Sequence, residues 1–94
     1  MMDRTAAQLA AAVTDRPEAQ RYELGIDGVI AFIDYRKSPG EVSMLHAEVP
    51  PQLGGRGVGS ALVQGAVRLA RAEGLQIKPY CSFIAAAMRR HPEW

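Results

Sequence analysis

This chain of 94 residues has no excess of either charge, no second cysteine and no long apolar run. Its formal net charge is +1, from 11 Lys and Arg residues and 10 Asp and Glu residues, and no long block of one sign interrupts the sequence. Proteins that bind nucleic acid without regard to its sequence depend on a basic face. The charge balance therefore argues against a nucleic-acid partner.

The single cysteine, Cys81, cannot form an internal disulfide, which fits a reducing cytoplasm. No apolar run reaches the roughly 18 residues that a membrane span requires. The alanine-rich residues 6–13 could suggest the core of a secretory signal, but the stretch is short, contains Gln8, and follows Asp3 and Arg4. We interpret it as a surface helix and expect a cytoplasmic protein with no membrane partner.

A chain of this length predicts one small domain over residues 1–94, with residues 1–15 as an N-terminal helical extension. Residues 5–13 are rich in good helix formers. We expect this helix to end before Pro17, because a residue that precedes proline avoids helical geometry.

The middle of the chain predicts strands. Residues 20–26 alternate between apolar and polar side chains, as in a strand with one exposed face. Residues 29–33 are apolar throughout, so the strand 29–35 is expected to be central. Asp27 and Gly28 lie between the two runs and tolerate the positive φ of a tight hairpin turn.

A third strand is expected at residues 41–49. Alternate residues of a strand share a face. The expectation is that one face carries Val42, Met44, His46 and Glu48.

The strongest helix prediction covers residues 57–73, because apolar residues recur there at helical spacing. Gly74 follows as a C-terminal cap. Gly65 lies in mid-helix and is interpreted as a point of close helix–sheet packing. Residues 75–80 predict a strand parallel to the third one, since the connection is long enough for a crossover helix, and residues 82–90 predict a last helix. The expected fold is a mixed α/β (α+β) sheet of three antiparallel strands, then a strand–helix–parallel strand crossover and a C-terminal helix.

The segment from Val49 to Ser60 leaves a strand, passes two prolines and enters the long helix through four glycines. The first amides of a helix have no internal acceptor, and the helix dipole adds partial positive charge there. Such a segment predicts a phosphate or pyrophosphate site. The P-loop motif fails because Ser60 stands where lysine is required, and the glycine spacing of a dinucleotide-binding motif is also wrong.

A third possibility is the coenzyme A motif Arg/Gln-x-x-Gly-x-Gly/Ala, which would be Gly54-Gly55-Arg56-Gly57-Val58-Gly59 here. At this point the chain resembles the GNAT superfamily of acyl-CoA-dependent N-acyltransferases, and most closely its small, minimal members of about one hundred residues. The resemblance covers roughly residues 19–94. Three further stretches carry it: Arg21-Tyr22-Glu23-Leu24, His46-Ala47-Glu48-Val49-Pro50, and Lys78-Pro79-Tyr80-Cys81-Ser82-Phe83 followed by His91-Pro92-Glu93-Trp94.

The resemblance implies a reduced GNAT fold that binds acetyl-CoA as acyl donor and acetylates an amine. It implies that backbone amides of the loop hold the pyrophosphate and that the backbone around Val49 pairs with the pantetheine arm. The chain departs from the family at Gly54, where Arg or Gln is usual, and Arg56 could substitute electrostatically. The candidate cofactor-binding residues are Val49, Gly54, Gly55, Arg56, Gly57, Val58, Gly59 and Ser60.

Acyl transfer to an amine needs a base for the amine proton and stabilisation at the thioester. Glu48 at the end of the third strand is the candidate base, or else a solvated carboxylate. His46 could relay a proton, or be a half-buried structural histidine. Cys81, at a helix N-terminus, could be a thiolate that takes up the acyl group, or a small buried apolar residue. His46, Cys81 and His91 lack the spacing of a zinc site, so no metal is expected.

Two other functions remain open from the sequence. Gly54 and the absence of the N-terminal helices of larger GNAT enzymes favour a CoA-binding module with little or no activity. An interaction protein that keeps the fold without the ligand is the third possibility. The amine acceptor is not identified by the sequence, and either a monomer or a weak homodimer is expected.

Overall fold

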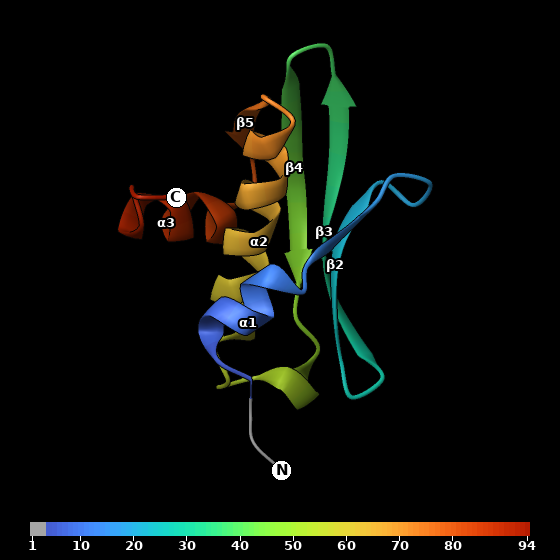
Figure 1. Cartoon of the computed structure of the whole chain (residues 1–94), viewed down its shortest axis with the longest axis vertical. Coiled ribbons are helices and arrows are strands. Elements are labelled where there is room, and N and C mark those ends of the chain that lie inside the picture. The colour runs from blue at the N-terminus through green and yellow to red at the C-terminus, as the bar shows by residue number, and fades with distance from the viewer. Residues whose placement is uncertain (1–3) are drawn as a thin grey trace.

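The computed structural model describes residues 4–94, so residues 1–3 of the expected N-terminal extension lie outside the described part. Within these described residues, three α-helices, a short 3-10 helix and five strands follow one another (Figure 1). They are α1 (Ala6–Ala11), β1 (Thr14–Arg16), β2 (Arg21–Ile26), β3 (Val29–Ser38), β4 (Glu41–Glu48), η1 (Pro51–Leu53), α2 (Val58–Ala72), β5 (Gln76–Pro79) and α3 (Ser82–Arg90).

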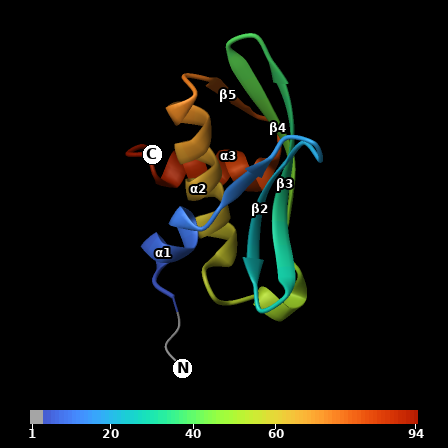
Figure 2. The ribbon, with the colours of Figure 1, turned by 45° about the vertical axis from the view of Figure 1, so that its right-hand side comes forward.

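The five strands form one sheet in the order β1-β2-β3-β4-β5. Neighbours from β1 to β4 are antiparallel, and β4 and β5 are parallel because α2 carries the chain back between them. The predicted mixed sheet with its crossover is confirmed, and β3 holds the central position expected of residues 29–35. The helices lie on one side of the sheet, and the other side carries no helix among the described residues (Figure 2).

The N-terminal region contains a strand that the sequence did not predict. α1 begins with a capping box, in which the Gln8 amide donates to the Thr5 hydroxyl at 3.1 Å and the Thr5 amide donates to the Gln8 side chain at 2.7 Å. It ends at Ala11 rather than at residue 13, and β1 follows. Arg16 precedes Pro17, and that position favours extended geometry. Pro17 therefore favours the extended end of β1, whereas α1 has already ended at Ala11.

The hairpin between β2 and β3 turns at Asp27 and Gly28, with φ values of 52° and 78°. Both residues take the positive φ that the turn requires, so this prediction is confirmed.

A β-bulge in β4 overturns the expected face of His46 and Glu48. The register between β3 and β4 shifts between Asp34 and Tyr35, so that Asp34 faces His46 while Tyr35 faces Met44, and Leu45 is the extra residue. An extra residue in a strand exchanges the faces of all residues beyond it. Val42 and Met44 are buried beneath the helices, whereas His46 and Glu48 lie on the open face. The prediction that these four residues share one face of the strand was therefore wrong. Val42 and Met44 lie on the buried face, and His46 and Glu48 lie on the open face.

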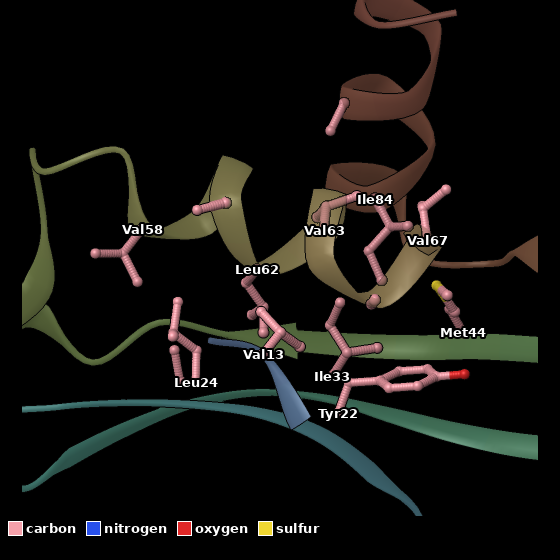
Figure 3. Close-up of a cluster of buried hydrophobic side chains, with 14 of the residues drawn as sticks. Val13, Tyr22, Leu24, Ile33, Met44, Val58, Leu62, Val63, Val67 and Ile84 are labelled. Carbon is pink, nitrogen blue, oxygen red and sulfur yellow. The ribbon is translucent and has the colours of Figure 1, made fainter. Parts of the chain in front are cut away.

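The core lies between the sheet and α2, and α3 extends it. Leu62 of α2 lies close to Leu24 and Ile33 of the sheet, and Ile84 of α3 lies beside α2 (Figure 3). The long helix predicted over residues 57–73 spans Val58–Ala72, and Gly74, the predicted C-terminal glycine, follows it with a φ of 74°. The last helix has the predicted bounds.

Gly65 in the middle of α2 permits a close approach, as predicted, although the neighbour is not the sheet. A Cβ at Gly65 would lie 2.4 Å from a methyl carbon of Val13 and 2.5 Å from the carbonyl oxygen of Ala10. The glycine therefore lets the end of α1 and the start of β1 pack directly on α2.

Candidate functional site

A hollow of about 310 Å³ lies at the N-terminal end of α2. The first helical hydrogen bond runs from the Ala61 amide to the Gly57 carbonyl oxygen at 3.1 Å, and no side chain caps the helix. The preceding amides therefore have no acceptor within the helix. The hollow is lined by Val49, Leu53, Gly54, Gly55, Gly57, Val58, Gly59, Ser60, Phe83 and Arg90.

Two glycines shape this hollow in different ways. Gly57, the residue before α2, has a φ of 71°, which residues with a side chain rarely adopt. Gly59 has no such φ, but a Cβ there would lie 2.8 Å from Cζ of Phe83 and 3.6 Å from a methyl carbon of Val49. Gly59 thus permits β4, α2 and α3 to meet closely at one point.

Gly54 stands where the GNAT motif usually has Arg or Gln, and its backbone does not require glycine. Its φ and ψ are −63° and 150°, an extended geometry open to any residue. A Cβ at Gly54 would lie 3.2 Å from the carbonyl oxygen of Pro51, which is a close but not a prohibitive contact. The missing side chain is therefore not demanded by the turn itself.

The guanidinium of Arg56 points away from this hollow. It lies 3.9 Å from the carboxylate of Asp27 in the β2–β3 turn. Arg56 lines a neighbouring hollow of about 320 Å³ together with Arg4 and Ile26, and the two hollows share Gly55 and Val58. The other predicted cofactor-binding residues line the hollow at the N-terminal end of α2, whereas Arg56 does not. The backbone of Arg56 still belongs to the loop.

Strands β4 and β5 separate next to the hollow. Their pairing covers only Glu41–Met44 and Gln76–Pro79, and it ends where the Tyr80 amide donates to the Met44 carbonyl oxygen at 3.0 Å. Beyond that point the chain turns at Cys81 into α3, while β4 continues to Glu48. The last residues of β4 therefore have no strand partner on the β5 side within residues 4–94.

His46 and Glu48 form a pair on the open face of the sheet. His46 Nε2 lies 3.5 Å from a carboxylate oxygen of Glu48, and the two side chains are 56% and 57% exposed. Glu48 faces Phe32 across the β3–β4 ladder. The His46 ring meets the Phe32 ring edge-on, with 6.3 Å between the ring centroids. The pair predicted from spacing is thus present, and it is accessible to a substrate.

Cys81 is the residue before α3, and its side chain makes no cap hydrogen bond. It is half-buried and packs against the core. Within residues 4–94, no hydrogen bond or ion pair joins Cys81 to His46 or Glu48. The structure therefore brings the predicted loop residues other than Arg56 into one hollow and places His46 beside Glu48. Cys81 stays a separate group at the end of β5.

Phe83 and Arg90 line the hollow, although neither was among the candidate cofactor-binding residues. Residues seven apart lie on the same face of a helix. That spacing places Phe83 and Arg90 together on α3, and it could have identified them as a pair. The packing of α3 against the loop is a tertiary contact, however, and no local pattern predicts it.

A polar cluster lies at the other end of α2. The ammonium of Lys37 donates to Asp15 at 2.8 Å and to Glu73 at 3.0 Å, and the Tyr35 hydroxyl donates to Asp15 at 2.6 Å. Burial and the bond to Asp15 raise the pKa of Tyr35 to about 12. Burial also raises the pKa of Tyr22, whose hydroxyl has no hydrogen-bond partner within residues 4–94. Burial alone would lower the pKa of Lys37, but the bonds to Asp15 and Glu73 outweigh it and raise that pKa.

A further hollow of about 330 Å³ lies where α1, α2 and the C-terminal residues meet, and Arg68, Arg71 and Trp94 are part of its lining. It shares no lining residue with the hollow at the N-terminal end of α2. Trp94 stacks on His91 with 4.2 Å between the ring centroids. Trp94 therefore packs on the domain.

The model of the GCN5-related N-acetyl-transferase family matches residues 21–94, which is well over half of the chain. The chain belongs to this family. The matched segment of this GNAT protein begins at β2 and includes the loop, α2, β5 and α3. A comparison with curated proteins finds no match to the chain.

No helix within residues 4–94 is long and apolar enough to cross a membrane. In the same range there is no group of three or more His, Cys, Asp or Glu residues that could hold a metal ion.

Proposed function

We propose that this GNAT-family chain is an acetyl-CoA-dependent N-acetyltransferase that transfers an acetyl group to an amine. The observation that supports this most is the hollow at the uncapped end of α2, directly beside the end of β4 that has no β5 partner. Free helix amides suit a pyrophosphate. An unpaired strand edge suits the amides of a pantetheine arm. A donor that carries both groups fits this pair of features.

The residues around the hollow fit such a donor. The amides before Ala61 would bind the pyrophosphate, and Gly59, without a Cβ, would leave room beside Phe83. Arg90, which lines the same hollow, adds positive charge for phosphate oxygens. Backbone groups from Leu45 to Val49 would pair with the pantetheine arm.

Glu48 and His46 are proposed to manage the proton of the acceptor amine. Glu48 would accept a proton from the amine, directly or through His46, as the amine nitrogen forms a bond to the thioester carbon. The carbon–sulfur bond then breaks, and the sulfur leaves with the electron pair and takes a proton. General base catalysis of this kind contributes about 10²- to 10⁴-fold to a rate.

Cys81 is proposed as a second reactive group at the acyl end of the site. Its thiolate would form a bond to the acyl carbon as the CoA sulfur leaves, and the amine would then displace Cys81. Its place before α3, where β5 ends, supports this role. After incubation with acetyl-CoA, the intact mass should show one added acetyl group that Cys81→Ala abolishes. If no labelled species forms and Cys81→Ala keeps full activity, transfer proceeds directly to the amine.

The first test is a calorimetric titration with acetyl-CoA and thermal melting, with ADP as control. A ligand present at about 100 times its Kd stabilises a fold by ~2.7 kcal/mol. That corresponds to a rise in melting temperature of roughly 11–22 °C for a domain of this size. Saturable binding tighter than that of ADP supports the donor site, and no binding overturns it.

Turnover is tested by following CoA release with amine acceptors in the presence of Glu48→Gln. We expect kcat to fall about 10²- to 10⁴-fold with the Kd for acetyl-CoA unchanged. Glu41→Gln, at the other end of the same strand, is the matched control and should keep full activity. Binding of acetyl-CoA without any release of CoA above the uncatalysed rate would favour the alternative, a CoA-binding module, which the missing side chain at Gly54 supports.

A further inference from the structure

The hollow between α1, α2 and the C-terminal residues is separate from the residues proposed for acetyl transfer. Its volume of about 330 Å³ falls within the range of small-molecule sites, which is about 300–1,000 Å³. It shares no lining residue with the hollow at the N-terminal end of α2, and neither His46 nor Glu48 lines it. A compound bound in this hollow would therefore be distinct from the acetyl donor.

The walls of this hollow are largely apolar. The segments that build them lie together on the side of the sheet that carries the helices (Figure 2). Gly65 of α2 has no Cβ and lets the end of α1 pack closely on it, which fixes two of the walls relative to each other. The alanines of α1 present only methyl groups, so they offer a low surface on which a flat ring can lie. The apolar lining residues are Ala7, Ala10, Ala11, Val67 and Trp94.

Trp94 gives the hollow an aromatic wall. Its ring stacks on that of His91 with an angle of 9° between the ring planes, so His91 covers one face of the indole. His91 is not part of the lining, and the hollow therefore lies against another side of Trp94. Contact between two aromatic rings is favourable beyond the apolar area that it buries. This wall suits a ligand that carries an aromatic ring.

Two guanidinium groups give the hollow positive charge. Arg68 and Arg71 both line it, and residues three apart on a helix lie on the same face. Nη2 of Arg68 donates to the carbonyl oxygens of Ala10 and Ala11 at 3.4 and 3.5 Å, and these acceptors carry no net charge. Neither arginine forms an ion pair within residues 4–94.

Glu93 also lines the hollow, and its carboxylate already has a partner, because Nδ1 of His91 lies 3.1 Å from it. Two guanidinium groups and one carboxylate leave the lining with one net positive charge. The matching group on a ligand is a single carboxylate, which a guanidinium binds through two parallel hydrogen bonds.

We propose that this hollow binds an aromatic monocarboxylic acid, whose ring packs on Trp94 and the alanines of α1 and whose carboxylate pairs with Arg68 and Arg71. The site goes beyond the proposed acetyl transfer and does not depend on it. One of its walls, α1, precedes the segment that the family model matches, which is residues 21–94. Because the ligand contacts both α1 and α2, its binding stabilises the packing of α1 on the domain.

The test uses the fluorescence of Trp94, which is the single tryptophan of the chain and therefore reports on this hollow. The probe is hydrocinnamate, a phenyl ring joined to a carboxylate by two methylene groups. Hydrocinnamyl alcohol has the ring without the charge, and propionate has the carboxylate without the ring. We expect a saturable change in emission with a Kd below about 1 mM, at least about tenfold tighter than for either control compound. Calorimetry measures the same Kd independently.

Two results of this titration would overturn the proposal. One is the absence of saturable binding by both methods up to about 10 mM hydrocinnamate. The other is propionate binding as tightly as hydrocinnamate, because the hollow would then be a site for small anions in general.

Arg71→Gln tests the role of the charge. Arg71 is exposed and forms no ion pair within residues 4–94, so its replacement should leave the fold intact. The Kd for hydrocinnamate should rise about tenfold, while that for hydrocinnamyl alcohol stays unchanged. Arg89→Gln is the matched control, since Arg89 is exposed on α3 and does not line the hollow. Equal affinities of the two variants for hydrocinnamate would contradict the proposed carboxylate pairing.

Ala7→Leu tests the location of the site. Ala6 and Ala7 are both exposed on α1, but Ala7 lines the hollow and Ala6 does not. A leucine at position 7 would fill the space of the ring, so hydrocinnamate should bind at least about tenfold more weakly. Ala6→Leu should keep the Kd of the wild type. If both variants bind hydrocinnamate like the wild type, the compound binds elsewhere and the proposal is wrong.

Other occupants of the hollow give different results. Saturating acetyl-CoA should leave the Kd for hydrocinnamate unchanged, because its proposed hollow shares no lining residue with this one. Competition between the two compounds would overturn the proposal. A dimer in sedimentation that Ala7→Leu converts to monomer would also overturn it, since a second copy of the chain would then fill the hollow.

Discussion

The two ends of α2 differ in whether their polar groups are hydrogen-bonded to other groups of the protein. At the C-terminal end, Lys37 donates to both Asp15 and Glu73, and Tyr35 donates to Asp15, so protein groups satisfy one another. At the N-terminal end no side chain caps the helix, and the free amides face a hollow that glycines keep open. Both ends are polar, but only one of them leaves hydrogen-bonding capacity for a ligand.

This difference separates stability from binding on a single helix. A partly buried hydrogen-bonded cluster contributes to the free energy of unfolding, and removal of one member leaves its partners without a bond. Open amides at a helix end contribute nothing until a ligand arrives. Substitutions at one end should therefore change stability, and substitutions at the other end should change affinity.

The largest effect is expected at the loop end. Gly57→Val should raise the Kd for acetyl-CoA at least about 100-fold, equal to about 2.8 kcal/mol, because a β-branched residue resists the positive φ that aims the amides. Calorimetry measures this change. Gly40→Val is the matched control, since Gly40 has a φ of 79° in the remote β3–β4 turn and Gly57 has 71°. Similar losses of stability are expected from both variants, and equal affinities would show that the loop does not bind the donor.

At the C-terminal end of α2 we expect a smaller effect, on stability rather than on affinity. Asp15→Ala removes the acceptor of both the Tyr35 hydroxyl and the Lys37 ammonium, and should lower the free energy of unfolding by about 2 kcal/mol. Urea unfolding measures this loss. At a temperature where the variant is fully folded, its Kd for acetyl-CoA should equal that of the wild type. A weakened Kd in the folded variant would show that the two ends of α2 are coupled.

Tyr22 and Tyr35 offer a comparison within the cluster. Their rings lie 4.7 Å apart, and only the Tyr35 hydroxyl has a partner within residues 4–94. Tyr35→Phe should destabilise the fold by about 1 kcal/mol, whereas Tyr22→Phe should stabilise it by about 0.5–1 kcal/mol, because it removes a buried hydroxyl that has no bond. Chemical denaturation of the two variants checks the signs. The same sign for both would contradict the assignment of partners.

The smallest effect concerns pH. The pKa of Tyr35 is raised from 10 to about 12, and that of Tyr22 is raised as well, so the unfolded chain loses these protons first. The contribution of each raised pKa to the free energy of unfolding is complete well below pH 10 and is lost progressively as the pH rises through that value. At pH 10 the loss is already about 0.4 kcal/mol per tyrosine. The raised pKa of Lys37 acts in the same direction. Unfolding at pH 8 and pH 10 should show a smaller decline in Tyr22→Phe than in the wild type, and an equal decline would refute the role of Tyr22.

Features set by local chemistry could be predicted from the sequence. The Asp27-Gly28 turn, the glycine before α2 and the bounds of α3 depend on residues that are neighbours in the chain. The parallel pairing of β4 and β5 followed from the length of the connection between them. The loop and the His46–Glu48 pair were likewise found from spacing.

Features set by tertiary contacts could not be predicted. β1 has only three residues, and its pairing with β2 is visible only once the sheet is formed. The bulge at Leu45 depends on the register between two strands, which no alternation within β4 specifies. Phe83 and Arg90 reach the hollow because α3 packs against α2, and Arg56 is drawn to Asp27 in a turn that is distant in sequence.

The bulge in β4 divides one strand into two segments whose even-numbered side chains meet different surroundings. Before Leu45, the even-numbered residues Val42 and Met44 belong to the core. After it, the even-numbered residues His46 and Glu48 meet the solvent. A profile of tolerated substitutions along β4 would therefore alternate with period two and reverse its phase at position 45. Loss of that single residue would exchange the two patterns and carry a charged pair into the interior.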